Sequence, residues 1–141
     1  MIIIFAKVRK VNQFSSEKLT KGVLICVQPE YLPLESDPTN NFWFYIYHVT
    51  IKNEGAERVQ LLSRHWIITD GEGKEEHVRG PGVVGEKPIL SKGESFSYTS
   101  ACPMNTAIGT MHGSYQMKTD AGLIFDANIA PFLLAEPNSL N

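Results

Sequence analysis

The sequence predicts an all-β fold, a two-sheet β-sandwich of about seven strands. Apolar and polar residues alternate with a period of two along most of the chain, and clusters of Gly, Pro and Asn interrupt the alternation at short intervals. This combination is typical of sandwiches and barrels, in which short strands follow one another through tight turns. No segment shows a convincing helical period, and seven is the strand number most often found in such sandwiches.

Seven segments carry the strand pattern, namely residues 22–31, 42–53, 58–70, 74–79, 95–101, 109–119 and 123–129. Turn residues separate them, as in Asp70-Gly71-Glu72-Gly73, where Asp and Gly tolerate a positive φ. Alternate residues of the second segment share an apolar face that we expect to line the core: Trp43, Tyr45, Tyr47, Val49 and Ile51. Its other face begins with Phe42, Phe44 and Ile46, which predicts cover from the N-terminal arm or from a partner.

The chain length and composition predict one domain. With 141 residues, of which 43% are hydrophobic, the chain can bury one core without disulfides or metal. We expect an N-terminal extension over residues 1–21, a sandwich over residues 22–136 and a C-terminal tail over residues 137–141. Pro33 and Pro38 cannot donate ladder hydrogen bonds, so residues 32–41 should be a connection.

The charge balance and the apolar runs exclude several classes of partner. Thirteen basic and 15 acidic residues give a net charge of −2, so we expect neither nucleic acid nor a membrane surface as a partner. The apolar residues 1–6 precede the first basic residues, contrary to a secretion signal, and no run approaches the roughly 20 apolar residues of a membrane span. We therefore expect a soluble, cytoplasmic protein in which Cys26 and Cys102 are reduced thiols.

Four stretches give the chain a family resemblance: VQPEYLPLESDP, QLLSRHWIITDGEGK, VRGPGVVGEKPIL and GESFSYTSACPMNTAIGTMHGSYQM. Through them, residues 22–136 resemble the ApaG domain family. The resemblance implies a fibronectin type III-like, immunoglobulin-like sandwich, which stands alone in the cytoplasm in bacteria and accompanies partner-binding domains in eukaryotes. It also implies an association with cobalt tolerance and magnesium efflux, but no established biochemical activity.

The segment GPGVVG, residues 80–85, has the spelling of a dinucleotide-binding loop. Pro88 and the following Ser91-Lys92-Gly93 turn leave no room for the helix that such a loop requires, and Pro81 lacks an amide hydrogen. The glycines therefore indicate a conformational role, although backbone amides flanked by Arg79 and Lys87 would still suit an anion.

The histidines and cysteines predict neither a metal site nor a disulfide. His48, His65, His77 and His112 have no close metal-ligand spacing, although strand pairing could bring distant histidines together. Glu72, Glu75 and Glu76 could meet a hard cation, but charged turns of this kind are usually solvated. Cys26, Trp66 and Cys102 copy the immunoglobulin order, but Ser100 replaces the tyrosine expected near the second cysteine.

Ser63, His65 and Asp70 cannot converge as a triad because one strand presents alternate residues to opposite faces. Arg64 and Trp66 share a face, either as a buried Trp beside a snorkelling Arg or as an exposed pair for a partner.

Together these features predict a binding module without catalytic residues or a cofactor. Its partner is expected to be a protein. The alternative is a phosphate, pyrophosphate or nucleotide ligand, or a divalent cation, at the glycine loop. A long free strand edge would also allow a homodimer. The predicted binding residues are Arg79, Gly80, Gly82, Gly85, Lys87, Arg64 and His65.

Overall fold

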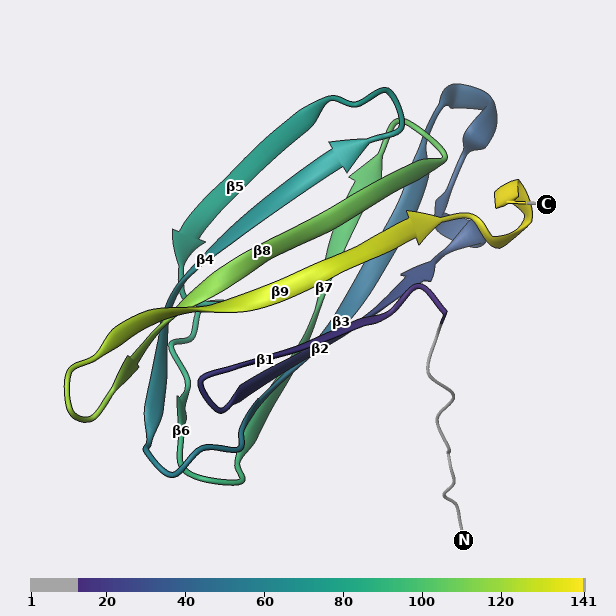
Figure 1. Ribbon diagram of the computed structural model, residues 1–141. Coiled ribbons are helices and arrows are strands. Elements are labelled where there is room, and N and C mark those ends of the chain that lie inside the picture. The colour runs from purple at the N-terminus through teal and green to yellow at the C-terminus, as the bar shows by residue number, and fades with distance from the viewer. Residues whose placement is uncertain (1–12, 141) are drawn as a thin grey trace, which may run out of the picture.

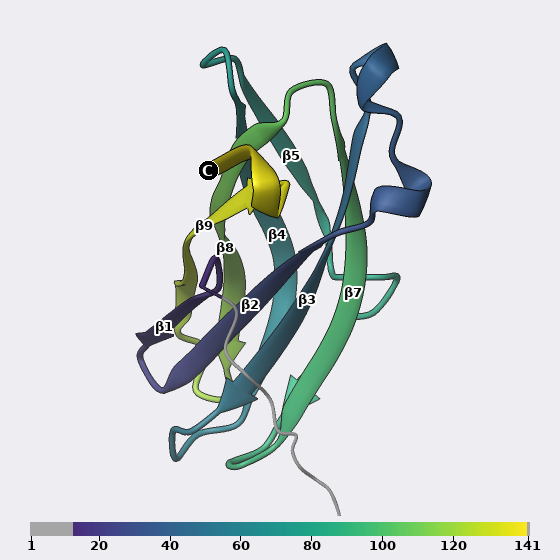
Figure 2. The same cartoon turned by 90° about the vertical axis from the view of Figure 1, so that its right-hand side faces the viewer.

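The protein is an antiparallel two-sheet β-sandwich in the computed structural model, which describes residues 13–140 (Figure 1). The strands are β1 (Ser16–Thr20), β2 (Val23–Tyr31), β3 (Trp43–Asn53), β4 (Val59–Asp70), β5 (Glu75–Pro81), β6 (Ile89–Leu90), β7 (Ser95–Met104), β8 (Ile108–Thr119) and β9 (Ile124–Ala135). One sheet has the order β1-β2-β3-β7 and the other β5-β4-β8-β9, with β6 also paired to β4. Figure 2 shows the two layers turned by 90°.

The predicted all-β sandwich is confirmed, and each of the seven predicted segments overlaps one strand, although β5, β7 and β9 run past the predicted ends. Two short strands, β1 and β6, were not predicted. β1 pairs with β2, with Ser16 opposite Val27, so the last part of the expected extension over residues 1–21 is a strand of the first sheet. The first part of that extension, residues 1–12, lies outside the described residues. In the expected tail, Pro137–Leu140 forms a 3-10 turn (η4).

The core lies between the sheets and follows the period of two. The face of β3 predicted to line the core does so, from Tyr45 to Ile51, because alternate side chains of a strand point to the same layer. Trp66 of β4 is buried, and its ring contacts the rings of Tyr47, Tyr115 and Phe132. The interpretation of Trp66 as a core residue is confirmed.

Residues 32–42 lie beside the start of β3. They form two 3-10 turns, η2 (Pro33–Glu35) and η3 (Pro38–Asn40), and fold back on the strand. The Phe44 amide donates to the Ser36 hydroxyl (2.8 Å), and the Leu32 amide donates to the Phe44 carbonyl (3.0 Å). This connection therefore continues the hydrogen bonding of β3 beyond its pairing with β2. Cover of the outer apolar face by the N-terminal arm or a partner stays a prediction.

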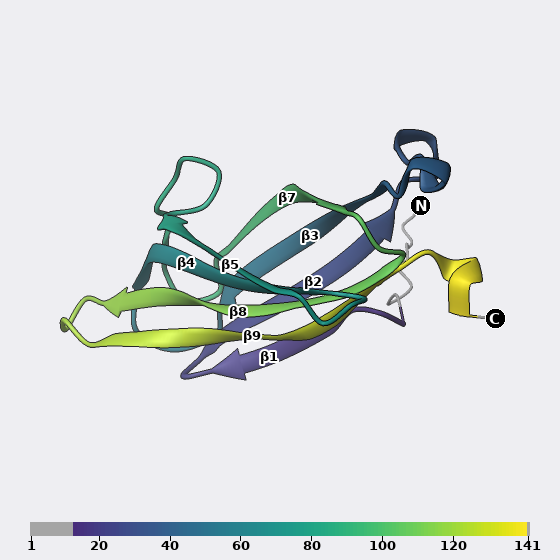
Figure 3. The ribbon, with the colours of Figure 1, turned by 90° about the horizontal axis from the view of Figure 1, so that it is seen from above.

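The two lateral sides of the sandwich differ. On one side β1 lies against β9 (Figure 3), where the Asn128 amide donates to the Thr20 hydroxyl (3.2 Å). On the other side, which we call the open side, β5 pairs only with β4 and β7 only with β3 among residues 13–140, so each has a free edge within the described chain. Among residues 13–140, no helical segment is long and apolar enough to span a membrane.

Candidate functional site

The glycine loop is a tight turn that follows β5. The Val83 and Glu86 backbones exchange two hydrogen bonds of 2.8 Å across Val84 and Gly85, which both have positive φ. The Gly82 amide donates to the carbonyl of Leu62 (2.9 Å). The amides of Gly82, Val83 and Glu86 are thus already bonded to carbonyls, which disfavours a phosphate cradle and explains the glycines by conformation.

Arg64 lies on the inner face of the sheet, beneath this loop. Its Nη1 donates to the carbonyl oxygens of Pro81 (2.9 Å) and Gly82 (2.9 Å). A Cβ atom at Gly80 would lie 2.8 Å from Nη2 of the guanidinium, so the absence of a side chain there makes room for Arg64. The Arg64 side chain therefore packs against Gly80 and is hydrogen-bonded to Gly82 at the open side of the sandwich, as expected of a snorkelling arginine.

His65 and Arg79 project from the opposite, outer face, where they are register partners on β4 and β5. A polar hollow of about 280 Å³ lies there, lined by Ser63, Arg64, His65, Arg79, Gly80, Ser114, Gln116 and Asp126. Partial burial, followed by the charge of Arg79, lowers the pKa of His65 and favours its neutral form. Four of the seven predicted binding residues thus border one hollow, whereas Gly85 and Lys87 lie on the exposed loop.

His77 lies on the same outer face, although the sequence analysis did not include it among the predicted binding residues. His65 Nε2 and His77 Nδ1 are 2.9 Å apart, and His77 Nε2 is 3.0 Å from Glu75 Oε1. The signal was the hairpin register: the turn after Asp70 places His77 opposite Ile67, diagonally next to His65. The spacing of the two histidines along the chain does not by itself show that they are neighbours.

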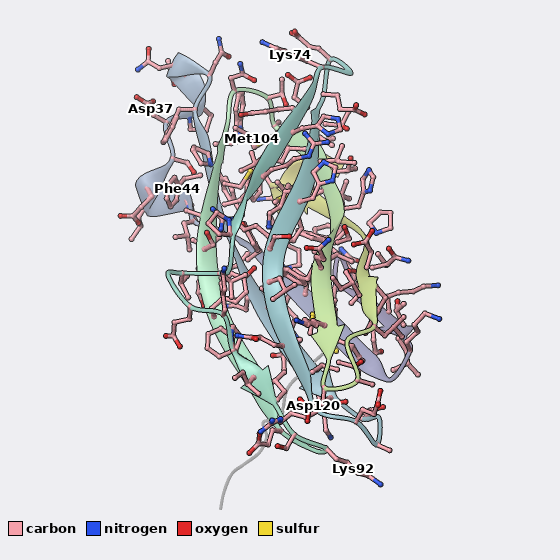
Figure 4. The ribbon with its side chains drawn as sticks, turned by 90° about the vertical axis from the view of Figure 1, so that its left-hand side faces the viewer. Asp37, Phe44, Lys74, Lys92, Met104 and Asp120 are labelled. Atoms are coloured by element: carbon pink, nitrogen blue, oxygen red, sulfur yellow. The ribbon has the colours of Figure 1, made fainter. Side chains whose placement is uncertain are left out.

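A second candidate site is an apolar groove at the open side, between the β4–β5 hairpin and the end of β7. It encloses about 300 Å³ and is lined by Phe42, Ile68, Asp70, Lys74, Glu76, Pro103, Met104 and Asn105. Figure 4 shows Met104 between the strands, with Lys74 at the hairpin tip. Phe42 is 39% exposed at its rim.

The walls of this open-side groove come from three distant parts of the chain. The carboxylate of Asp70 accepts hydrogen bonds from the backbone amides of Glu72 and Lys74 (2.9 Å each), and these bonds stabilise the hairpin turn beside the groove. Asp70 therefore has a turn-forming role. A third hollow of about 520 Å³ adjoins Gln13, where the described chain begins.

One further chain of polar contacts crosses the outer face of the first sheet. His48 Nε2 lies 3.1 Å from Glu30 Oε1, and His48 Nδ1 lies 2.8 Å from the Thr99 hydroxyl. The His48 and Glu30 side chains are about half exposed, and cross-strand pairs of this kind commonly stabilise sheets. The two cysteines are free, with Cys102 buried and Cys26 half-buried.

Comparisons with known proteins agree on one family. The sequence model of the ApaG domain matches residues 33–119. "Protein ApaG" of Bradyrhizobium sp. (strain ORS 278) is 49% identical over 120 residues, which cover 85% of this chain and 92% of that protein. "Protein ApaG" of Dechloromonas aromatica (strain RCB) is 51% identical over 113 residues, covering 80% and 89% of the two chains.

Solved structures show the same fold. The crystal structure of the putative ApaA protein from Bordetella pertussis superposes with a TM-score of 0.81 at 47% identity, covering 85% of this chain and 98% of that one. The C-terminal domain of wzt has a TM-score of 0.51 at 11% identity over 89% of this chain and 79% of that one, a likeness of fold alone.

Proposed function

This chain belongs to the ApaG domain family, and we propose that it is a non-catalytic binding module whose partner is an extended segment of another protein. The observation that carries the proposal is the apolar open-side groove beside the free edge of β5. Apolar side chains at a rim next to unpaired backbone groups offer two kinds of contact that an added strand uses together.

The free edge of β5 suits the partner better than that of β7. Pro103 has no amide hydrogen and lies in the wall of the groove, so β7 lacks a donor at that point. β5 reaches its proline, Pro81, only at its last residue. A partner strand along β5 would therefore meet an uninterrupted ladder before the glycine loop.

The groove also indicates the chemistry of the segment. Its volume of about 300 Å³ accommodates a small number of apolar side chains, and its apolar walls include Phe42 and Met104. Two acids and one base line it, since Asp70 and Glu76 accompany Lys74. We expect an apolar anchor residue flanked by a basic residue.

Two further properties belong to this proposal. Free thiols at Cys26 and Cys102 support a cytoplasmic location. A net charge of −2 supports a protein partner over nucleic acid or an anionic membrane.

Selection of peptides from a random library tests the proposal, followed by calorimetry with the selected peptides. Phe42→Ser removes an exposed apolar side chain from the groove and should weaken binding at least tenfold. Ile89→Ser is the matched control, because Ile89 is 55% exposed and lies on β6, outside the residues that line the groove. That variant should bind within twofold of the unchanged chain.

Hydrogen exchange on the complex then locates the peptide. Slower exchange of β5 amides supports strand addition. Equal binding by both variants, or protection confined to other strands, contradicts the proposal. Sedimentation equilibrium without peptide adds a further arm: a dimer lost in Phe42→Ser would show that a second copy occupies the groove instead.

A further inference from the structure

We propose that His65 and His77 form a binding site for a divalent transition-metal ion on the outer face of the β4–β5 hairpin. The two imidazoles belong to neighbouring strands and face each other, with 2.9 Å between His65 Nε2 and His77 Nδ1 and 5.1 Å between ring centroids. Each ring is held on a hydrogen-bonded strand, so the backbone already brings the nitrogens together.

The separation of the two nitrogens matches the edge of a coordination polyhedron. Metal–imidazole bonds are about 2.0–2.1 Å long. Two such bonds at a right angle place their nitrogens about 2.8–3.0 Å apart, and at the tetrahedral angle about 3.3–3.4 Å apart. The observed 2.9 Å matches this separation, but the 5.1 Å between centroids places the two rings almost end to end, as in an N–H···N hydrogen bond. Both rings must therefore rotate on their strands before the two lone pairs converge on an ion beside the pair.

Glu75 prepares His77 for this role. A carboxylate accepts hydrogen bonds, so the Glu75 oxygen 3.0 Å from Nε2 favours the tautomer with the proton on that nitrogen. The lone pair of His77 then lies on Nδ1, which faces His65. A carboxylate behind a ligating imidazole is the usual outer-shell arrangement of protein metal sites. His65 becomes the second ligand when its proton moves from Nε2 to Nδ1, with no change of charge.

The donor set decides which ions bind. Within residues 13–140, no group of three or more His, Cys, Asp or Glu side chains is arranged to hold a metal, so water completes the coordination of the two imidazoles. Imidazole suits Zn²⁺, Ni²⁺ and Cu²⁺, whereas Mg²⁺ prefers oxygen ligands. The site should therefore be of moderate affinity, take Ni²⁺ and Zn²⁺, and leave Mg²⁺ unbound.

The test uses the full chain with NiCl₂ as a paramagnetic probe. Amide resonances should broaden around His65 and His77, and Zn²⁺ should reverse the broadening by competition, whereas Mg²⁺ should not. Calorimetry should show at least a tenfold loss of Ni²⁺ affinity in His65→Gln and in His77→Gln. Glu75→Gln should weaken binding about 10-fold or more through loss of the outer-shell carboxylate.

His48→Gln is the matched control. His48 is also exposed and also contacts a carboxylate, Glu30, but its other nitrogen meets the Thr99 hydroxyl instead of a second imidazole. Its loss should change Ni²⁺ affinity less than twofold. Broadening centred on His48, unchanged affinity in the two hairpin variants, or no binding at millimolar Ni²⁺ would overturn the proposal. Urea unfolding of each variant verifies that the fold is retained.

Discussion

The strongest stability prediction concerns two glycines of one loop that differ in their surroundings. Gly82 and Gly85 both have positive φ, +59° and +80°, and both would accept an alanine only in the left-handed region. A Cβ atom at Gly85 meets nothing within 4 Å, whereas one at Gly82 would overlap the backbone carbonyl of Glu86. Comparing the alanine variants of Gly82 and Gly85 therefore distinguishes the cost of the left-handed conformation from the cost of steric overlap.

The magnitudes follow from these two effects. Gly85→Ala should cost about 1–2 kcal/mol, the penalty of the left-handed conformation. Gly82→Ala adds overlap with an atom that cannot move freely, because Glu86 is hydrogen-bonded to the backbone of buried Val83. Overpacking of this kind costs about 1–3 kcal/mol more, for a total of about 2–5 kcal/mol.

Urea unfolding followed by tryptophan fluorescence measures both variants. The midpoint should fall further for Gly82→Ala than for Gly85→Ala, with an unchanged m-value in each. Equal midpoints would show that the Glu86 carbonyl yields without cost and that overlap plays no part. A larger loss in Gly85→Ala would refute the reasoning altogether.

Three further predictions concern buried groups. Asn53→Ala removes two hydrogen bonds that the buried side-chain amide donates to backbone carbonyls and one that it accepts from a backbone amide, and should cost about 2–4 kcal/mol in urea unfolding. Arg64→Met leaves the carbonyls of Pro81 and Gly82 without their donor, and should cost about 1–3 kcal/mol and speed amide exchange in the glycine loop. Burial raises the pKa of Cys102 from 9.0 to about 11. Between these values the folded state keeps the thiol proton that the unfolded state loses. The stability of the fold is therefore unaffected by this thiol below pH 9 and falls as the pH rises towards 11. Cys102→Ala should therefore lose about 2 kcal/mol less than the unchanged chain between pH 8 and pH 11.

The sequence predicted the strands whose one face is buried, and it missed the strands that lack this pattern. β3 and β8 carry long apolar alternations, so their positions followed from the period of two. β1 has the sequence SEKLT and no buried residue, so only its pairing with β2 makes it a strand. Such pairing is a tertiary effect that local patterns do not contain.

β9 is longer than the sequence analysis predicted. The predicted segment ended at residue 129, yet the strand continues through Pro131 to Ala135. The β8–β9 register shifts there, since Gly113 pairs with Ile129 and Met111 with Phe132. Two residues of β9 thus face one residue of β8, and this bulge accommodates a residue without an amide hydrogen.

The candidate sites also differ in how much of each can be predicted from neighbouring residues in the sequence and how much depends on the tertiary fold. The glycine loop was found because its residues are contiguous, but its spelling could not show that its amides are internally bonded. Arg64 and His65 were selected together, and their opposite faces follow from the alternation that the strand pattern itself predicts. The open-side groove joins Phe42, Ile68 and Met104 from separate elements, so it required the fold.

β5 connects the two proposed sites and also keeps them separate. Glu75 and His77 project to the outer face with the imidazole pair, whereas Glu76 projects between them towards the groove. Because successive residues of a strand point to opposite sides, His77→Gln should leave the groove intact and Phe42→Ser should leave the imidazole pair intact. A metal ion would join the outer faces of β4 and β5, while an added peptide would use the backbone edge of β5. Loss of one activity without the other therefore identifies which side of β5 carries it.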